Sequence, residues 1–386
     1  MQKLQVTSFY HLEVCSLRSG VLVGFNFFHK VIEAAYTTDM VLKRTKRRET
    51  VLEVSATERE ADDLDETLRP RTLSEYVGQT AIKSHLGVYL QAAKKRVEPL
   101  GHTILHGPPG LGKTTLAYIL AWEMNSQIRV TSGPAIEKPG DLASLLTNLQ
   151  SGDILFIDEI HRLRPAIEEV LYSAMEDYAL DLVIGKGPSA RSMRIDLQPF
   201  TLIGATTKVG AVSMPLRDRF IHNFKLQFYL PEELKKIVLR TSRILEVPVE
   251  PDAAALIANA SRATPRISNR LVRAVRDFAQ VNNEPKITAI RVSATLTSLG
   301  IDKRGLDNTD RLILLSIIEK FGGGPVGLGA LAAVLSDEQE TLEDVYEPYL
   351  LQCGYLQRTP KGRVATKMAY ELLGMQLPER SGPSLF

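Results

Sequence analysis

The stretch Gly107–Thr114, GPPGLGKT, decides the fold of this chain. It matches the pattern G-x-x-x-x-G-K-[ST]; a short strand-like run, Ile104–His106, precedes it, and a helical pattern, Lys113–Met124, follows. Glycines allow backbone N–H groups to wrap around phosphates, and the N-terminus of the following helix adds positive potential. The sequence therefore predicts a nucleotide-binding loop in which Lys113 reaches the outer phosphates.

A second motif, ILFIDE at Ile154–Glu159, brings Asp158 to a point 45 residues after Lys113 (158 − 113). Its four apolar residues predict a buried strand with two acids at its carboxyl end. Asp158 is expected to hold Mg²⁺ together with Thr114, and Glu159 to orient or deprotonate an attacking water. The competing interpretation is an ordinary acidic helix start. The upstream phosphate loop favours the hydrolytic site.

Two weaker signals concern residues near the same site. Thr201–Thr207, TLIGATT, reads as a strand whose final threonines, Thr206 or Thr207, could sense the γ-phosphate. His161, which completes DEIH, is as well explained by a solvated surface histidine as by a catalytic one. The residues alone leave this choice open.

Arginines at two places admit a phosphate-binding role. Pro215–Phe220, PLRDRF, offers Arg217 and Arg219, either for surface ion pairs or for the γ-phosphate of a neighbouring subunit. The residues do not decide between these alternatives. Arg266 stands at the start of a helix with Thr264 as N-cap, where the helix dipole disfavours a cation, so a phosphate partner is expected.

The order of patterns along the chain predicts an α/β fold followed by two smaller units. Strands alternate with helices from Leu68 to Tyr229, which indicates a parallel sheet covered on both faces. Residues 231–300 are helical, and one helix is expected to bury a stripe of Ile267, Leu271, Ala274 and Phe278. From Ile301, helical segments, the last at 338–351, precede a hairpin at Tyr355–Thr366, as in a winged helix.

Composition sets the outer limits. The chain has 386 residues, 44% apolar and 24% charged, which fits two or three ordinary domains and excludes a mostly disordered chain. No run approaches the roughly 18 apolar residues of a membrane span. The two cysteines, Cys15 and Cys353, predict neither a disulfide framework nor a cysteine zinc site, as expected in a reducing cytoplasm.

The net charge of +2 hides a local contrast in the last domain. Tyr355–Tyr370 contains four basic residues and no acid, whereas Asp337–Glu347 contains six acids. A recognition helix with that many acids is poorly suited to a DNA groove. The basic hairpin is therefore expected to hold phosphates without reading bases, unless it is only a solvated turn.

Taken together, these motifs resemble the AAA+ ATPases, and within them the RuvB family of bacterial Holliday-junction branch-migration motors. The resemblance covers about 310 residues and includes stretches, such as EKFGGGPVGL, that are not general AAA+ features. The matching segments are LRPRTLSEYVGQ (Leu68–Gln79), SGPAIEKPGDLASLLTNL (Ser132–Leu149), LFIDEIHRL (Leu155–Leu163), AMEDYALDLVIGKGPSARS (Ala174–Ser192), TLIGATTKVG (Thr201–Gly210), TPRISNRLVRAVRDFAQV (Thr264–Val281), EKFGGGPVGL (Glu319–Leu328) and RTPKGRVAT (Arg358–Thr366).

The resemblance implies a role for individual residues. Catalysis would involve Lys113, Asp158, Glu159 and Arg219, the last acting in trans with Arg217 as second choice. Arg358 and Arg363 would meet DNA phosphates, and Thr114 with Asp158 would hold the Mg²⁺ of ATP. The nucleotide would be bound by Leu68 and Arg69 on the adenine side, Gly110, Gly112, Lys113, Thr114 and Thr115 at the phosphates, Glu176, Asp177 and Tyr178 at the border, and Arg219, Tyr229 and Arg266.

The resemblance also implies architecture and partners. It predicts a large AAA+ domain at 61–229, a helical lid at 230–300 and a winged-helix head at 301–386. The motor would use ATP and Mg²⁺, form a homohexamer on duplex DNA and Holliday junctions, and dock on RuvA through the Gly185–Arg191 turn. RuvC would join a larger complex in the bacterial cytoplasm. The alternative from another class is an ATP-regulated winged-helix DNA switch that does not translocate.

Several positions depart from the family pattern. Ile221 and Ala263 stand where the family has glycine, and Gln339 replaces an arginine that would contact DNA. Residues 1–60 match nothing in the family. They read as a poorly ordered tail or an unused upstream start, with Met40 as an alternative first residue, and a secretory signal is disfavoured.

Overall fold

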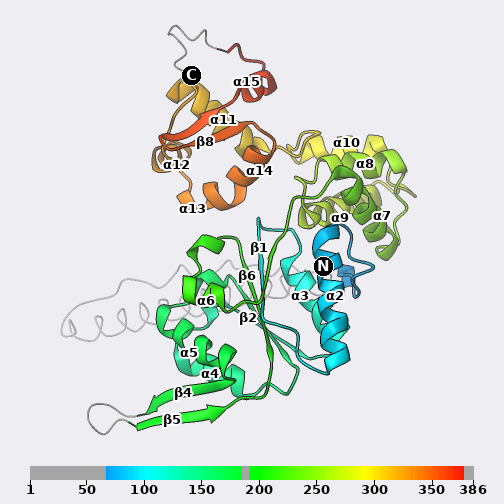
Figure 1. Ribbon diagram of the computed structural model, residues 1–386. Helices are drawn as coiled ribbons and strands as arrows, with labels where there is room; N and C mark the ends of the chain where they lie inside the picture. The colour runs from blue at the N-terminus through cyan, green and yellow to red at the C-terminus, as the bar shows by residue number, and fades with distance from the viewer. Residues whose placement is uncertain (1–66, 185–190, 378–386) are drawn as a thin grey trace, which may run out of the picture. The chain divides into compact units, whose positions relative to one another are not determined.

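The computed structural model describes residues 67–184 and 191–377 (Figure 1). The expectations for residues 1–60, and for all of the Gly185–Arg191 turn except its last residue, lie outside these described residues. The described residues from Leu68 onward fall in one compact unit. None of the described helices is long and apolar enough to cross a membrane.

The centre of the first domain is a five-stranded sheet in the order β2-β3-β6-β1-β7, and every neighbouring pair is parallel. The register pairs His106 with Thr206 and Ile157 with Gly204, so the carboxyl ends of β1, β3 and β6 meet at one edge. Ligands of open α/β sheets bind at that edge. The strands are β1 (Thr103–His106), β2 (Ile128–Ser132), β3 (Ile154–Asp158), β6 (Thr201–Thr206) and β7 (His222–Lys225).

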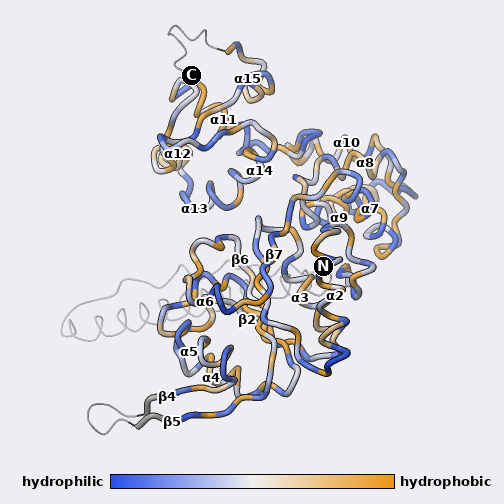
Figure 2. Tube along the Cα trace, in the orientation of Figure 1, coloured by the Kyte–Doolittle hydropathy of each residue, from blue (hydrophilic) through white to orange (hydrophobic). Residues whose placement is uncertain are grey.

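Helices cover both faces of this sheet, as the sequence predicted. Side chains of β3 alternate: Ile154 and Phe156 join the core beneath α2 and α3, whereas Leu155 and Ile157 join the core beneath α4 and α5. Figure 2 shows apolar residues within the sheet as well as along the helices, and the two central strands β3 and β6 are the most completely buried. The helices are α2 (Thr80–Arg96), α3 (Lys113–Met124), α4 (Pro139–Thr147), α5 (Pro165–Glu176) and α6 (Met214–Asp218), with short 3₁₀ turns η1 (Gly133–Ala135), η2 (Ile160–Arg162) and η4 (Val209–Ala211).

A separate antiparallel hairpin, β4 (Ala179–Ile184) with β5 (Arg191–Asp196), extends from the domain (Figure 1). Its register runs from Ala179 opposite Asp196 to Ile184 opposite Arg191. The two strand-like arms expected on either side of the proposed RuvA-docking turn therefore pair with each other.

The second domain is all helical: α7 (Pro231–Ile244), α8 (Pro251–Asn259), α9 (Pro265–Val281) and α10 (Ala289–Ser298). Thr264 is the residue before α9, as predicted, although its side chain makes no capping bond to that helix. The predicted stripe on α9 was wrong in part. Leu271 is buried, but Val272, Val275 and Ala279 fill the core in place of Ala274 and Phe278.

The third domain is a winged helix, as predicted. Its third helical segment, the position of a recognition helix, differs from the single helix expected, because a π-helical turn interrupts it. The elements are α11 (Asn308–Phe321), α12 (Leu328–Leu335), α13 (Gln339–Thr341), the π turn η5 (Leu342–Tyr346), α14 (Glu347–Gln352), the wing strands β8 (Leu356–Thr359) and β9 (Gly362–Ala365), and α15 (Lys367–Leu373).

Candidate functional site

The phosphate loop joins β1 to α3 and has a backbone that only glycine adopts without strain. Gly110 and Gly112 have φ values of +78° and +93°. A Cβ atom on Gly112 would lie 3.0 Å from the hydroxyl of Tyr76, and one on Gly110 would lie 3.1 Å from the Cβ of Arg266. The loop is therefore enclosed on one side by Tyr76 and on the other by the first turn of the lid helix α9.

Two buried tyrosines hold this loop from behind. The hydroxyl of Tyr76 donates to the backbone oxygen of Leu111 at 3.3 Å, and the hydroxyl of Tyr229 lies 3.1 Å from that of Tyr76. Burial raises the pKa of Tyr229 to about 12, so the phenol stays neutral. Tyr229 was predicted at the lid junction, and its N–H donates to Ala263 of the lid. Tyr76 was missed, although it lies within the matching segment Leu68–Gln79.

Lys113 is buried and already hydrogen-bonded. Its Nζ donates to the backbone oxygens of Gly107 at 2.8 Å and Pro108 at 2.9 Å. Burial lowers the pKa of Lys113 to about 8; the charge of Arg266 lowers it further, whereas that of Asp158 opposes the shift. Asp158 at the end of β3 and Arg266 at the start of α9 are therefore close enough to Lys113 to act on its charge, so the three elements contribute to one site.

The two acids at the carboxyl end of β3, Asp158 as its last residue and Glu159 directly after it, have different partners. Asp158 accepts a hydrogen bond from the N–H of Glu159 at 2.9 Å. Glu159 has a left-handed backbone, with φ of +48°, and its carboxylate lies 3.3 Å from Arg162. A non-glycine residue held in this region stores strain of the kind found at active sites. Asp158 therefore bonds to the backbone of the turn, whereas Glu159 pairs with Arg162.

Thr206 ends the central strand β6 and is joined to His161. The Thr206 hydroxyl lies 3.0 Å from Nδ1 of His161 and accepts a hydrogen bond from the N–H of Lys208 at 2.9 Å. Burial lowers the pKa of His161, which favours the neutral ring at pH 7. The two weak sequence signals, a strand-end threonine and the histidine of DEIH, thus form one contact beside the acids.

Arg219 lies among residues of α5 and α6. Its guanidinium stands 4.5 Å from the centre of the Tyr172 ring, and it donates to Glu176 at 3.0 Å and to the backbone oxygen of Pro215 at 2.8 Å. Its Nε is among the few buried side-chain polar atoms of the described residues without a partner. None of these partners belongs to the phosphate loop of the same chain.

The predicted border residues, Glu176, Asp177 and Tyr178, have partners outside the phosphate loop. Glu176 binds Arg219 directly, Asp177 forms a 3.2 Å ion pair with Arg194 of the hairpin, and the ring of Tyr178 packs edge-on against Phe200. Of these three residues, only Glu176 contacts Arg219 directly.

The predicted adenine-side residues contact two helices, Leu68 through Arg240 of α7 and Arg69 through Tyr118 of α3. Leu68 is buried and its backbone oxygen accepts from Arg240 at 2.6 Å. The guanidinium of Arg69 stands 4.6 Å from the centre of the Tyr118 ring, and the ring of Trp122 is 5.8 Å from Tyr118. Arg240 was not predicted, because a single arginine within a helical pattern does not indicate a contact with the nucleotide site.

The residues present fit a magnesium nucleotide. Mg²⁺ in such sites takes one carboxylate or hydroxyl from the protein and its other ligands from phosphates and water. Asp158 and Thr114, at adjacent strand and helix ends, are donors of that class, with Thr115 next to them. Among the described residues, no cluster of His, Cys, Asp or Glu could hold a metal without a ligand's help.

The wing arginines are engaged with an acid of the head. Arg358 and Arg363 both hydrogen-bond to Glu347, at the start of α14. The side chain of Arg358 is 49% exposed and that of Arg363 is 14% exposed. Other acids of the recognition segment face the first domain, where Lys208 pairs with Asp344 at 2.9 Å. Four of the six acids, Glu340, Glu343, Asp344 and Glu347, therefore pair with cations of the protein.

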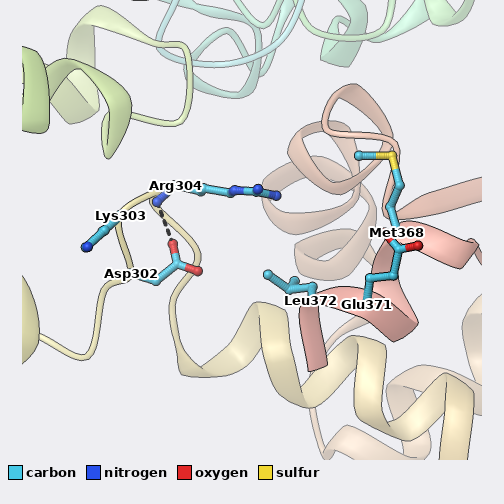
Figure 3. A pocket seen from close by; sticks show the side chains of 6 residues that line it. All are labelled: Asp302, Lys303, Arg304, Met368, Glu371 and Leu372. Carbon is cyan, nitrogen blue, oxygen red and sulfur yellow. Dashed lines mark hydrogen bonds between the residues drawn. The ribbon is translucent and has the colours of Figure 1, made fainter. Parts of the chain in front are cut away.

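The head has a pocket of about 430 Å³, and Figure 3 shows the side chains that line it. Asp302, Lys303 and Arg304 approach it from the segment before α11, and Met368, Glu371 and Leu372 from α15. The backbone N–H of Arg304 donates to Asp302 at 2.8 Å. The lining mixes acidic, basic and apolar side chains and does not indicate one class of ligand.

Comparisons with known proteins agree with this architecture domain by domain. The model of the Holliday junction DNA helicase RuvB P-loop domain matches residues 68–226, that of the RuvB AAA lid domain 229–302, and that of the RuvB C-terminal winged helix domain 303–374.

Solved structures show the same relationship. The Thermotoga maritima RuvB Holliday junction branch migration motor is 51% identical, with a TM-score of 0.75, over 81% of this chain and 100% of its own. A mutant of that protein gives a TM-score of 0.76 at 51% identity, over 81% of this chain and 99% of its own. This chain belongs to the RuvB family.

Proposed function

We propose that this chain is an ATP-driven motor that moves duplex DNA through Holliday junctions during recombination and repair. The observation that carries the proposal is the separation of Arg219 from an otherwise complete hydrolytic site. Lys113, Asp158, Glu159 and Arg266 gather around one phosphate loop, whereas Arg219 is held by Glu176 on other elements. An arginine needed for hydrolysis and placed elsewhere completes the site of a neighbouring subunit.

In this mechanism each group has a defined task. Lys113 would exchange its two backbone acceptors for β- and γ-phosphate oxygens, and Asp158 with Thr114 would hold Mg²⁺. Mg²⁺ bound with ATP supplies neutralisation of the phosphate charge. Glu159 orients the attacking water, and Arg219 of the adjacent subunit stabilises the charge that develops on the γ-phosphate. Arg266, on the first turn of α9, binds the phosphates and so makes the position of the lid depend on whether ATP or ADP is bound.

The assembly proposed is a homohexameric ring in the bacterial cytoplasm, working with RuvA and, in a larger complex, RuvC. The β4–β5 hairpin supports a docking role because it stands out from the domain as a paired arm. The wing supports DNA binding because its basic residues are on the hairpin and the neighbouring recognition segment is acidic. Phosphate contacts without base contacts suit a motor that travels along any sequence.

The trans arrangement is tested by mixing two inactive variants. Arg219→Ala should bind ATP but lose ATPase activity by roughly 10³-fold or more, because it lacks the charge that stabilises the transition state. Lys113→Ala should fail at its own site while still offering Arg219 to a neighbour. Mixtures of the two variants should recover a fraction of the wild-type ATPase activity. No ATPase activity at any mixing ratio would refute the trans role.

The second candidate is an ATP-regulated DNA switch without translocation, favoured only by the winged helix. A synthetic four-way junction with RuvA and ATP separates the two. A motor converts the junction to duplex products, and the Glu159→Gln variant binds ATP and junction without this conversion. A protein that binds the junction in an ATP-dependent manner, and leaves it intact while hydrolysing ATP, is the switch.

A further inference from the structure

The two wing arginines occupy positions that should repel each other. Arg358 on β8 and Arg363 on β9 are direct cross-strand partners. Like charges directly opposite each other destabilise an antiparallel pair. The wing therefore needs a compensating group at this position.

One carboxylate supplies the compensation. Glu347 accepts from Nε and Nη2 of Arg358 at 3.2 and 2.6 Å, and from Nε and Nη2 of Arg363 at 2.9 and 3.0 Å. Its side chain is only 4% exposed. Burial alone would raise the pKa of Glu347, but the hydrogen bonds from Arg358 and Arg363 lower it below the ordinary value, so the group stays ionised.

This geometry leaves the same part of each guanidinium available. Both arginines use the Nε–Nη2 edge on Glu347, and Nη1 of each has no hydrogen bond within the part of the chain that the structure describes. Glu343 adds weaker contacts, at 3.2 Å to Arg358 and 3.9 Å to Arg363, from a side chain that is 36% exposed. The planar fork of arginine suits simultaneous binding to two anions.

We propose that Glu347 is the positioning residue of the DNA interface: a buried anion that fixes Arg358 and Arg363 side by side so that their free edges take duplex phosphates. This inference rests on the proposed DNA-binding function of the wing. DNA binding then requires Glu347, although this residue is negatively charged like DNA itself.

The direction in which one substitution changes DNA affinity distinguishes a positioning role of Glu347 from a simple effect of its charge. Glu347→Gln, in the full-length chain, removes a negative charge, so charge alone predicts tighter DNA binding. Positioning predicts the opposite: affinity for a fluorescent duplex falls several-fold, and the slope of log K against log salt becomes shallower by about 0.9 for each phosphate that the variant no longer neutralises. The matched control is Glu338→Gln, an exposed acid in the same segment, which should bind unchanged or slightly more tightly.

Three further measurements keep the test decisive. Thermal melting identifies variants with a folded head, and Glu347→Asp, which keeps the charge but shortens the side chain, should bind with intermediate affinity. In an Arg358→Ala, Arg363→Ala background, Glu347→Gln should weaken binding no further. Unchanged or tighter binding by folded Glu347→Gln overturns the inference. If the double arginine variant itself binds DNA normally, the proposed wing interface fails instead.

Discussion

Ala263 has a left-handed backbone, with φ of +54°, and so does its neighbour Arg262, with φ of +50°. These residues lie immediately before Thr264 and Arg266, and Ala263 accepts a hydrogen bond from the N–H of Tyr229 at 3.0 Å. The resemblance leads us to expect glycine at this position, and the backbone is consistent with that expectation, because an L-residue is strained in a conformation that glycine adopts freely.

Ala263→Gly is therefore expected to stabilise the protein, even though glycine loosens the unfolded chain. Relief of the left-handed strain outweighs that loss by about 0.5–1 kcal/mol. Urea unfolding of the two proteins measures the difference. A matched Ala258→Gly change, at a buried position inside α8, should destabilise instead. Destabilisation by Ala263→Gly would contradict this account of the junction.

His102 predicts how stability depends on pH. Its Nδ1 accepts from the N–H of Leu202 at 2.9 Å and its Nε2 lies 3.1 Å from the backbone oxygen of Met175, so the ring is neutral. Burial lowers the pKa of His102 in the folded state. The unfolded histidine therefore takes up a proton first, and this contribution to stability, present above about pH 6.5, is lost as pH falls through the lower folded pKa.

The free energy of unfolding should thus decrease from pH 7 to pH 5, by up to about 1.4 kcal/mol per pH unit for each such histidine. His102→Gln should show a shallower slope, measured by urea unfolding at each pH. Equal slopes in both proteins would assign the effect to other groups.

At the scale of elements, the sequence predicted helices and strands well and their facing less well. The motifs at β1, β3 and β6 were found because glycines, acids and apolar runs mark strand ends directly. On α9 the stripe was misassigned, because Ile267, Phe278 and the valines Val272 and Val275 are all apolar and only packing against α7 and α8 selects among them. The π turn in the recognition segment contains no glycine or proline, so the sequence did not indicate that the helix would be interrupted there.

The paired tyrosines behind the phosphate loop predict a non-additive effect. Tyr76→Phe or Tyr229→Phe alone should cost less than about 1 kcal/mol, because the remaining hydroxyl can still donate to Leu111. The double variant leaves that buried oxygen unsatisfied and should cost about 1–3 kcal/mol, more than the sum of the singles. Unfolding free energies of the four proteins give the coupling, and simple additivity would show that the hydroxyls act independently.

At the scale of the whole molecule, the order of domains follows from the sequence, but the contacts between distant segments do not. Arg262 of the lid donates to both carboxylate oxygens of the fully buried Asp310 on α11, at 2.9 and 3.1 Å. Burial raises the pKa of Asp310 to about 6, although Arg262 lowers it. No local pattern links two charges 48 residues apart (310 − 262), so this pair could not be predicted.

Removing Arg262 should leave the buried Asp310 without its main partner and raise the pKa of Asp310 further, so the carboxyl must take up a proton to stay buried. Arg262→Ala is expected to cost about 3–5 kcal/mol of stability. Adding Asp310→Asn should recover much of that loss, because a buried amide is neutral at any pH and needs neither the arginine nor a proton. Urea unfolding of the single and double variants is the measurement. A double variant no more stable than Arg262→Ala would mean that the arginine acts through its ring contacts with Tyr346 and Tyr349 instead.

The aromatic pair on α3 has a practical consequence. Trp122 is the only tryptophan of the chain, it is 42% exposed, and it lies beside Tyr118, over which Arg69 is placed. Its emission therefore comes from one known place, next to the segment expected to receive adenine. A change in fluorescence intensity or wavelength on adding ATP would follow nucleotide binding in the unlabelled protein, and the same indole would stay silent to events confined to the wing.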